Sequence, residues 1–243
     1  MEAASESGLK RWALALVLLL LMITPTVSAV GYFVLAEALP PWVQQTLYAL
    51  AKLVMLFPAV WLLCIDRISF RIPVPTRTEV FTGLGFGVFV AVGMGLLYAF
   101  LFRSTAVFSE AATAIEKKMI GFGIDTPIRF LCFAAVISVA HSFLEEYYWR
   151  GFIFEKLRLF VSAEMSGLLS SLAFTGHHIV ILGKYFDWGS VYQILFSIGV
   201  TIGGIIWCLM FYRWRTLYAP WISHACIDAA IFAVGYDLCR QIF

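Results

Sequence analysis

Seven long apolar runs limit the folds that are open to this chain. A helix needs about 20 predominantly apolar residues to cross the hydrocarbon layer of a bilayer, which is roughly 30 Å thick. Seven stretches meet this requirement, and they cover residues 12 to 35, 43 to 65, 80 to 102, 127 to 154, 163 to 183, 190 to 212 and 217 to 238. We therefore predict an all-α fold, a polytopic transmembrane helical bundle of about seven spans.

The overall composition supports a lipid environment. Apolar residues make up 62% of the 243 residues and charged residues 13%, against about 45 to 50% and about 25% in soluble domains. The 17 basic and 15 acidic residues leave a net charge of +2, which is too small and too dispersed for a nucleic-acid interface. We expect a multi-pass integral membrane protein of the cell (inner) membrane, with the lipid bilayer as a partner and no nucleic acid.

The first apolar run allows two interpretations. Lys10 and Arg11 precede it, as basic residues precede the apolar part of a cleaved signal peptide. The apolar character continues to Leu35, however, which is longer than a signal peptide requires. We favour an uncleaved membrane anchor.

A charged segment separates the third and fourth runs. Residues 106 to 120 carry too many charges to span a membrane, yet their apolar residues recur at helical spacing. This pattern predicts an interfacial helix. Asp125, Thr126 and Pro127 then supply a helix cap and a first-turn proline, which predict the start of the fourth span.

Glycines cluster inside two of the predicted spans. They are Gly83, Gly85, Gly87, Gly93 and Gly95 in the third span, and Gly199, Gly203 and Gly204 in the sixth. Both clusters contain a small-xxx-small spacing, which lets two helices approach closely in lipid. We expect tight helix packing at both clusters.

Ionisable residues gather inside three of the spans. Each one costs at least about 2.5 to 3.5 kcal/mol at the centre of a bilayer on insertion scales, so it needs a partner or a function. The three stretches that carry them are residues 141 to 150, 174 to 178 and 224 to 228, and they contain all four histidines of the chain. A purely structural role would not require such costly residues on three separate spans, so we interpret them as one functional site.

Spacing along the fourth span assigns its two glutamates to different faces. Glu146 and Arg150 are four residues apart, so the arginine can neutralise that carboxylate. Glu145 lies about 100° around the helix from Glu146, given about 3.6 residues per turn, and shares its face with His141. We interpret Glu146 as structural and Glu145 as available for chemistry.

Counting residues along the helices predicts that the three stretches lie at similar depths in the membrane. If the fourth and fifth spans form a hairpin that turns near residues 161–162, Glu145 and His178 are each sixteen residues from that turn. At about 1.5 Å per residue they lie at the same level, about 24 Å from it. His224 and Asp228 are four residues apart on the last span and can face the same cavity.

The order of these motifs resembles a known family. Glu-Glu-x-x-x-Arg, Phe-x-x-x-His and His-x-x-x-Asp follow one another on successive apolar helices. This arrangement is similar to that of the CPBP intramembrane proteases, which include the type II CAAX prenyl endopeptidases and the bacterial Abi proteins linked to bacteriocin self-protection. The similarity covers roughly residues 126 to 238, and the first three spans carry no recognisable signature.

The resemblance implies an intramembrane endopeptidase that hydrolyses peptide bonds of membrane-associated proteins or peptides with activated water. It implies that Glu145 is the catalytic glutamate and that His178 is its partner in activating the water. Glu146 and Arg150 would support the site. Amide hydrolysis needs a base for water, a proton for the leaving nitrogen and a donor for the oxyanion, and these residue types can supply them.

For the third motif, the resemblance implies that His224 and Asp228 stabilise the oxyanion. CAAX-processing members have Asn where this chain has Asp228, and an ionised carboxylate accepts hydrogen bonds but does not donate them. Asp228 would therefore have to be protonated, or it would orient His224 instead. His141 and His177 are expected to be neighbours of the site.

Two further alternatives remain open from the sequence. One Glu and two His, namely Glu145, His178 and His224, could hold zinc with an open position for water, but the HExxH spacing is absent and we favour hydrolysis without a cofactor. The alternative function is a noncatalytic membrane immunity or binding protein of the Abi type. An ion carrier is less well supported, because no inverted repeat is evident.

The motifs also suggest a division of the chain. We predict amino-terminal membrane spans and the interfacial helix in residues 1–125, and a CPBP-like catalytic helical core in residues 126–243.

Overall fold

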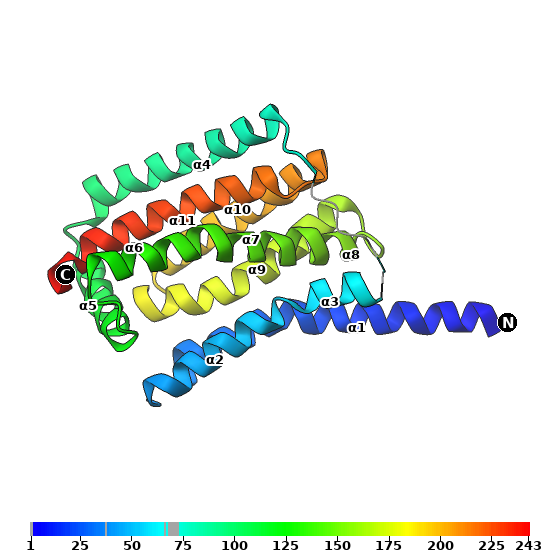
Figure 1. Cartoon of the computed structure of the whole chain (residues 1–243), viewed down its shortest axis with the longest axis horizontal. Helices are drawn as coiled ribbons and strands as arrows, with labels where there is room; N and C mark the ends of the chain where they lie inside the picture. Colours follow the sequence, from blue (N-terminus) through cyan, green and yellow to red (C-terminus); the bar gives the residue numbers. More distant parts are fainter. Residues whose placement is uncertain (1, 37, 66, 68–72) are drawn as a thin grey trace.

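Helices form all regular elements in the residues that the computed structural model describes, which are 2–36, 38–65, 67 and 73–243 (Figure 1). Within these residues, seven helical stretches are long and apolar enough to cross a membrane: Arg11–Leu35, Trp42–Cys64, Arg77–Phe102, Pro127–Leu157, Ala163–Phe186, Val191–Trp214 and Tyr218–Ile242. They coincide with the seven predicted spans, apart from shifts of a few residues at the ends. The predicted all-α polytopic bundle is confirmed.

The first two spans differ in continuity. The first consists of α1 (Glu2–Val30), which runs directly into a π-helical turn, η1 (Gly31–Leu35). The second consists of α2 (Pro41–Val54) and α3 (Phe57–Cys64), which are separated by a turn. Pro58 lies in the first turn of α3, where its missing N–H is tolerated, whereas the middle of a continuous helix would lose a hydrogen bond there.

The third span is followed by the predicted interfacial helix. The span consists of α4 (Arg77–Leu97) and a π-helical turn, η2 (Tyr98–Phe102), and a separate helix, α5 (Ala106–Gly121), comes next. This helix contacts both α9 (Ala163–Phe186) and α11 (Tyr218–Cys239). The structure thus confirms a helix at the predicted place, and its position at the membrane interface stays a prediction.

Five consecutive helical segments build the fourth span. They are α6 (Pro127–Ala135), the π-helical η3 (Val136–His141), α7 (Ser142–Glu146), the π-helical η4 (Tyr147–Phe154) and α8 (Glu155–Leu157). Thr126 caps α6 by accepting from the Arg129 N–H, and Pro127 is its first residue, as predicted. The sequence pattern indicated this helix but not the two π-helical segments within it.

The last three spans are α9, α10 (Val191–Trp214) and α11, which ends in a short 3-10 turn, η5 (Arg240–Ile242). Serine side chains cap the first two: Ser162 accepts from the Met165 N–H and Ser190 from the Gln193 N–H. The turn between α10 and α11 is held to α4 by a hydrogen bond from the Thr216 hydroxyl to Glu79. The start of α4 and the start of α11 therefore lie at the same end of the bundle (Figure 1).

Small residues bring α4 against α11, as the glycine cluster predicted. A Cβ on Gly83 would lie 2.7 Å from the Ala219 carbonyl oxygen, and a Cβ on Gly87 would lie 2.7 Å from Cys226 Cβ and 2.9 Å from Ser223 Cα. Lipid is as apolar as a leucine side chain, so spans associate through close packing rather than through removal of apolar surface from water. These two glycines allow α4 to approach the helix that carries His224.

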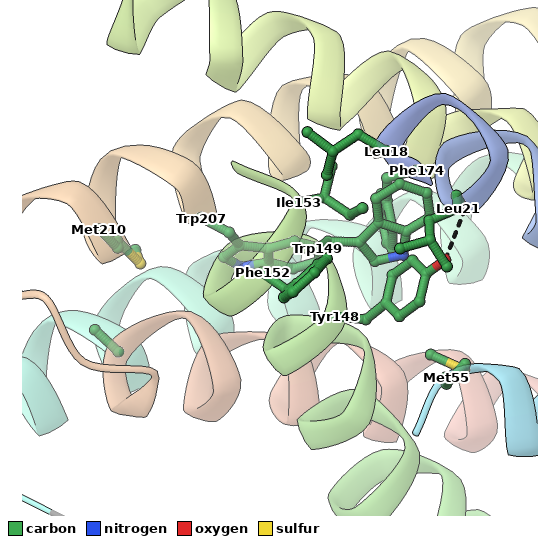
Figure 2. Close-up of a cluster of buried hydrophobic side chains, with 11 residues drawn as sticks. Leu18, Leu21, Met55, Tyr148, Trp149, Phe152, Ile153, Phe174, Trp207 and Met210 are labelled. Carbon is green, nitrogen blue, oxygen red and sulfur yellow. Dashed lines mark hydrogen bonds between the residues drawn. The ribbon is translucent and has the colours of Figure 1, made fainter. Parts of the chain in front are cut away.

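A cluster of buried apolar side chains joins the amino-terminal spans to the rest of the bundle (Figure 2). It combines residues from the first two spans with residues from the fourth to the last: Leu18, Leu21, Met55, Tyr148, Trp149, Phe152, Ile153, Phe174, Trp207, Met210 and Ala219. The Tyr148 hydroxyl donates a hydrogen bond of 2.6 Å to the Leu21 carbonyl, drawn as a dashed line in Figure 2. The first span is thereby fixed to the helix that carries the two glutamates.

We predict that Gly87→Val destabilises the protein, because the added side chain would meet backbone atoms of α11 that cannot move aside. Overpacking of this kind costs about 1 to 3 kcal/mol. The thermal unfolding midpoint in detergent should fall. The matched control is Gly85→Val on the same helix, where a Cβ would meet nothing within 4 Å. Equal midpoints for the two variants would contradict the close approach of α4 and α11.

Candidate active site

The two adjacent glutamates lie on a five-residue α-helical segment between two π-helical segments. Glu145 and Glu146 end α7, His141 ends η3 immediately before it, and η4 begins at Tyr147. A π-helical turn closes i→i+5 hydrogen bonds, is wider than an α-helical turn and frequently occurs at functional sites. The local geometry at the glutamates is therefore set by the helix type on both sides of them.

Three imidazoles from three spans surround the Glu145 carboxylate. His141 Nε2 lies 3.2 Å and His177 Nε2 lies 3.4 Å from Oε1, while His224 Nε2 lies 3.6 Å from Oε2. The Glu145 side chain is only 7% exposed. The i, i+4 contact with His141 is the one that the spacing predicted, and the other two contacts are made between helices.

His178 lies in the same group with a defined ring orientation. Its Nδ1 is 3.1 Å from the Phe174 carbonyl oxygen. Because a carbonyl only accepts, Nδ1 must carry the proton, and we assign Nε2 as the nitrogen with the free lone pair. One ligand atom from each of Glu145, His177 and His178 lies within 4.8 Å of the others. Glu145 and His178 thus lie at one level of the bundle, and their pairing as catalytic partners stays a prediction.

Glu146 is held in a buried ion pair. Arg150 Nη1 donates to its Oε1 at 2.9 Å, and both side chains are completely buried. The same oxygen accepts from His224 Nδ1 at 2.8 Å. Arg150 also donates through Nη2 to the Gly204 carbonyl at 3.2 Å. Glu146 thus fixes the ring of a histidine on α11 while its own charge is compensated by the arginine.

Aromatic rings restrict the orientations of the Arg150 and His224 side chains. Arg150 lies over the rings of Phe174 and Trp207, with its Cζ 4.7 Å and 4.9 Å from their centroids. Trp207 stacks on His224 with a centroid separation of 4.2 Å and an interplanar angle of 16°. The Trp207 indole N–H donates to the Ser223 hydroxyl at 2.5 Å. The plane of His224 is therefore set by stacking and its rotation by the bond to Glu146.

Asp228 lies at the edge of the group. Its Oδ1 is 3.7 Å from His224 Nε2, the ring nitrogen that also faces Glu145. The structure therefore brings the predicted residues Glu145, Glu146, Arg150, His178, His224 and Asp228 into one cluster, in which His178 and Asp228 are half-buried. His141 and His177, expected only as neighbours, are in direct contact with the Glu145 carboxylate.

The residues that could bind a metal differ from the predicted set. Glu145, His178 and His224 were expected as ligands, but within the described part of the chain the group of suitable atoms is Glu145, His177 and His178. His224 is not in that group, although its Nε2 lies 3.6 Å from Glu145 Oε2; its Nδ1 is bonded to Glu146. Imidazole and carboxylate are ligand types that zinc accepts, so this revised group is the one relevant to the zinc alternative.

A lysine from the second span reaches the site, and sequence reasoning missed it. Lys52 on α2 places its Nζ 3.1 Å from His141 Nε2, the nitrogen that also contacts Glu145. Lysine inside an apolar run is costly and marks a functional-site candidate by itself, so a signal was present. Spacing within one helix could not show which other span the side chain would meet.

We predict that Arg150→Met strongly destabilises the protein, because it leaves the Glu146 carboxylate buried without its cation. Breaking a buried pair in this way costs about 3 to 5 kcal/mol. The thermal midpoint in detergent should fall sharply, and Glu146→Gln in the same chain should restore part of the loss. The control is Arg129→Met, which breaks the exposed i, i+4 pair with Asp125 on the same span and should change the midpoint little. Similar losses for both arginines would contradict the supporting role of the buried pair.

Comparison with known proteins finds one family model that is similar to part of the chain. Residues 127–230 match the family model described as "Type II CAAX prenyl endopeptidase Rce1-like". This segment contains all the acidic and histidine residues of the cluster described above, and it excludes Lys52. No curated protein and no solved structure matches the chain.

Proposed function

We propose that this multi-pass membrane protein is an intramembrane endopeptidase acting on membrane-associated proteins or peptides, because residues 127–230 match the model of the Rce1-like family of type II CAAX prenyl endopeptidases. The observation that carries the proposal is the convergence of one buried carboxylate, Glu145, with histidines from three spans. A solely structural charge cluster would not need these groups around a single carboxylate. We propose the cell membrane as its location.

In the proposed reaction, Glu145 and His178 activate water. The Glu145 carboxylate and the free lone pair of His178 Nε2 are two acceptors on different helices, so one water molecule can donate a hydrogen to each of them. This leaves an oxygen lone pair of the water for the peptide carbonyl. The proton taken up by Glu145 would then pass to the leaving nitrogen. A positioned general base of this kind contributes about 10² to 10⁴ in rate.

His224 is the proposed oxyanion donor. Glu146 and Trp207 hold its ring, and its Nε2 faces the same space as Glu145. A proton on this nitrogen would let it donate to the developing oxyanion, and one such donor is worth about 10² to 10³ in rate. Asp228, an acceptor when ionised, lies next to the same nitrogen, so we assign it an orienting role.

His141, His177 and Lys52 are proposed to position the base. His141 Nε2 lies between Lys52 Nζ and Glu145 Oε1, at 3.1 Å and 3.2 Å. His177 stacks with Trp149 at an interplanar angle of 8°, which fixes its ring while its Nε2 faces Glu145. These contacts restrict the Glu145 carboxylate to one rotamer. The entropy cost of ordering this side chain is therefore met when the protein folds and does not add to the barrier of the reaction.

We predict that Glu145→Gln abolishes proteolysis without loss of the fold. Glutamine keeps the size of the side chain but is not a base, so turnover should fall at least about 100-fold. The measurement compares peptide termini of membrane proteins in cells that express the wild type or the variant. Glu110→Gln, at an exposed position of α5, is the matched control and should leave the termini unchanged.

Two outcomes would count against this assignment. Identical termini in cells with the wild type and with Glu145→Gln, both present at equal levels, would contradict a catalytic glutamate. Protection from a peptide toxin that survives both Glu145→Gln and His178→Ala would instead select the noncatalytic immunity function.

We propose that the reaction needs no metal, and this can be tested separately. Glu145 Oε1 already has two imidazole nitrogens within 3.4 Å, and the HExxH arrangement that places two zinc ligands and a base on one helix is absent. Purified protein should contain well below one zinc per chain, and a chelator should leave peptidase activity unchanged. Zinc near one equivalent, with activity lost to the chelator and regained on zinc addition, would overturn this mechanism and point to Glu145, His177 and His178 as ligands.

A further inference from the structure

An arginine-lined pocket lies away from the candidate active site, where the fourth and sixth spans end. Its volume is about 610 Å³, and it is lined by Arg158, Leu209, Tyr212, Arg213 and Arg215. Arg158 follows α8 directly, and Arg215 follows α10 directly. The pocket is therefore located where helices leave the predicted hydrocarbon layer.

A glutamate on α8 fixes two of the three arginines. Glu155 accepts from Arg158 Nη1 at 2.9 Å, and it binds Arg215 in a two-pronged contact of 2.6 Å and 2.7 Å. These hydrogen bonds raise the pKa of Arg215 above its usual value. Arg158 is also held over the Tyr212 ring, with its Cζ 4.9 Å from the centroid. Two guanidinium groups are thus ordered before any ligand arrives.

The backbone adds to this order. Arg215 has a φ of 59°, in the left-handed region that non-glycine residues rarely adopt. The conformation ends α10 with a bond from the Arg215 N–H to the Phe211 carbonyl. It also directs the Arg215 side chain to Glu155, since the two make the contact described above.

The third arginine supplies charge that the protein itself does not compensate. Arg213 is exposed, and no carboxylate among the described residues is within ion-pair distance of it. It has a cation–π contact with Trp214, at 5.9 Å from Cζ to the ring centroid. Three guanidinium groups against the single carboxylate of Glu155 leave an excess of two positive charges at the pocket.

The apolar lining distinguishes a lipid from a soluble anion. Leu209 and Tyr212 are 60% and 47% exposed, and they lie on α10 beside the arginines. The pocket therefore presents positive charge at the end of a span and apolar surface toward its middle. A lipid with an anionic phosphate headgroup matches both parts, whereas free phosphate matches only the charged part.

We propose that this pocket binds the headgroup of an anionic membrane phospholipid. Arg213 and Arg215 contact the phosphate, and Leu209 and Tyr212 contact the adjoining acyl chain. The site is independent of the proposed peptidase activity, since none of these residues belongs to the Glu145 cluster. It would anchor the ends of the fourth and sixth spans at one leaflet of the membrane.

The test measures lipid binding by native mass spectrometry of the full chain in detergent. Dioleoyl phosphatidylglycerol should bind more tightly than dioleoyl phosphatidylcholine. Arg213→Gln should weaken phosphatidylglycerol binding about fivefold, and Arg213→Gln with Arg215→Gln about 25-fold. Replacing Arg213 leaves no carboxylate without its cation, so the single variant should keep the wild-type thermal midpoint. Its lipid binding can therefore be measured even if the double variant does not fold.

The control is Arg77→Gln, an exposed arginine at the start of α4, at the same end of the bundle but outside the pocket. It should leave phosphatidylglycerol binding unchanged. Equal binding of the two lipids, full binding by Arg213→Gln, or equal losses for Arg77→Gln and Arg213→Gln would overturn the site. Displacement of phosphatidylglycerol by an equal concentration of inorganic phosphate would assign the pocket to a soluble anion and overturn the lipid proposal.

Discussion

A carboxylate and a guanidinium that are both removed from water attract each other strongly, but each loses its hydration. Other groups must offset part of that loss. Glu146 and Arg150 contact three further helices, through His224 on α11, the Gly204 carbonyl on α10 and the Phe174 ring on α9. Glu146 Oε2 and Arg150 Nε have no hydrogen-bond partner among the described residues. Because all these contacts end on one ion pair, the relative positions of four spans depend on it.

The proposed chemistry follows from this arrangement. Glu146 holds His224 by Nδ1, which leaves Nε2 directed toward Glu145. The two adjacent glutamates therefore have separate tasks: one fixes a partner helix and the other faces the histidines. The amino-terminal spans take part as well, since Leu21 accepts the Tyr148 hydroxyl and Lys52 reaches His141. The predicted division at residue 125 stays a prediction, but the site draws on residues from both sides of it.

Much of the fold and of the site could be predicted from the sequence, and the limits have a physical cause. The seven spans follow from apolar length alone, and the contacts of Glu146 with Arg150 and of His141 with Glu145 follow from i, i+4 spacing. What spacing cannot give is the rotation of one helix relative to another. His177 and His178 are adjacent on α9 and point about 100° apart, so choosing between them required the packing of α9 against the fourth span. The contact of Lys52 with His141 has the same origin.

The short α-helical segment α7, between two π-helical segments, has a consequence for how this region can vary. A substitution changes one side chain, but a deletion or insertion of one residue within α7 would turn the later residues of the span by about 100°. Arg150 would then face a different neighbour, and the side chains of α8 would be rotated by the same angle. In this span, the number of residues is therefore constrained as tightly as their identities, and natural variants are expected to differ by replacement and to keep the same count.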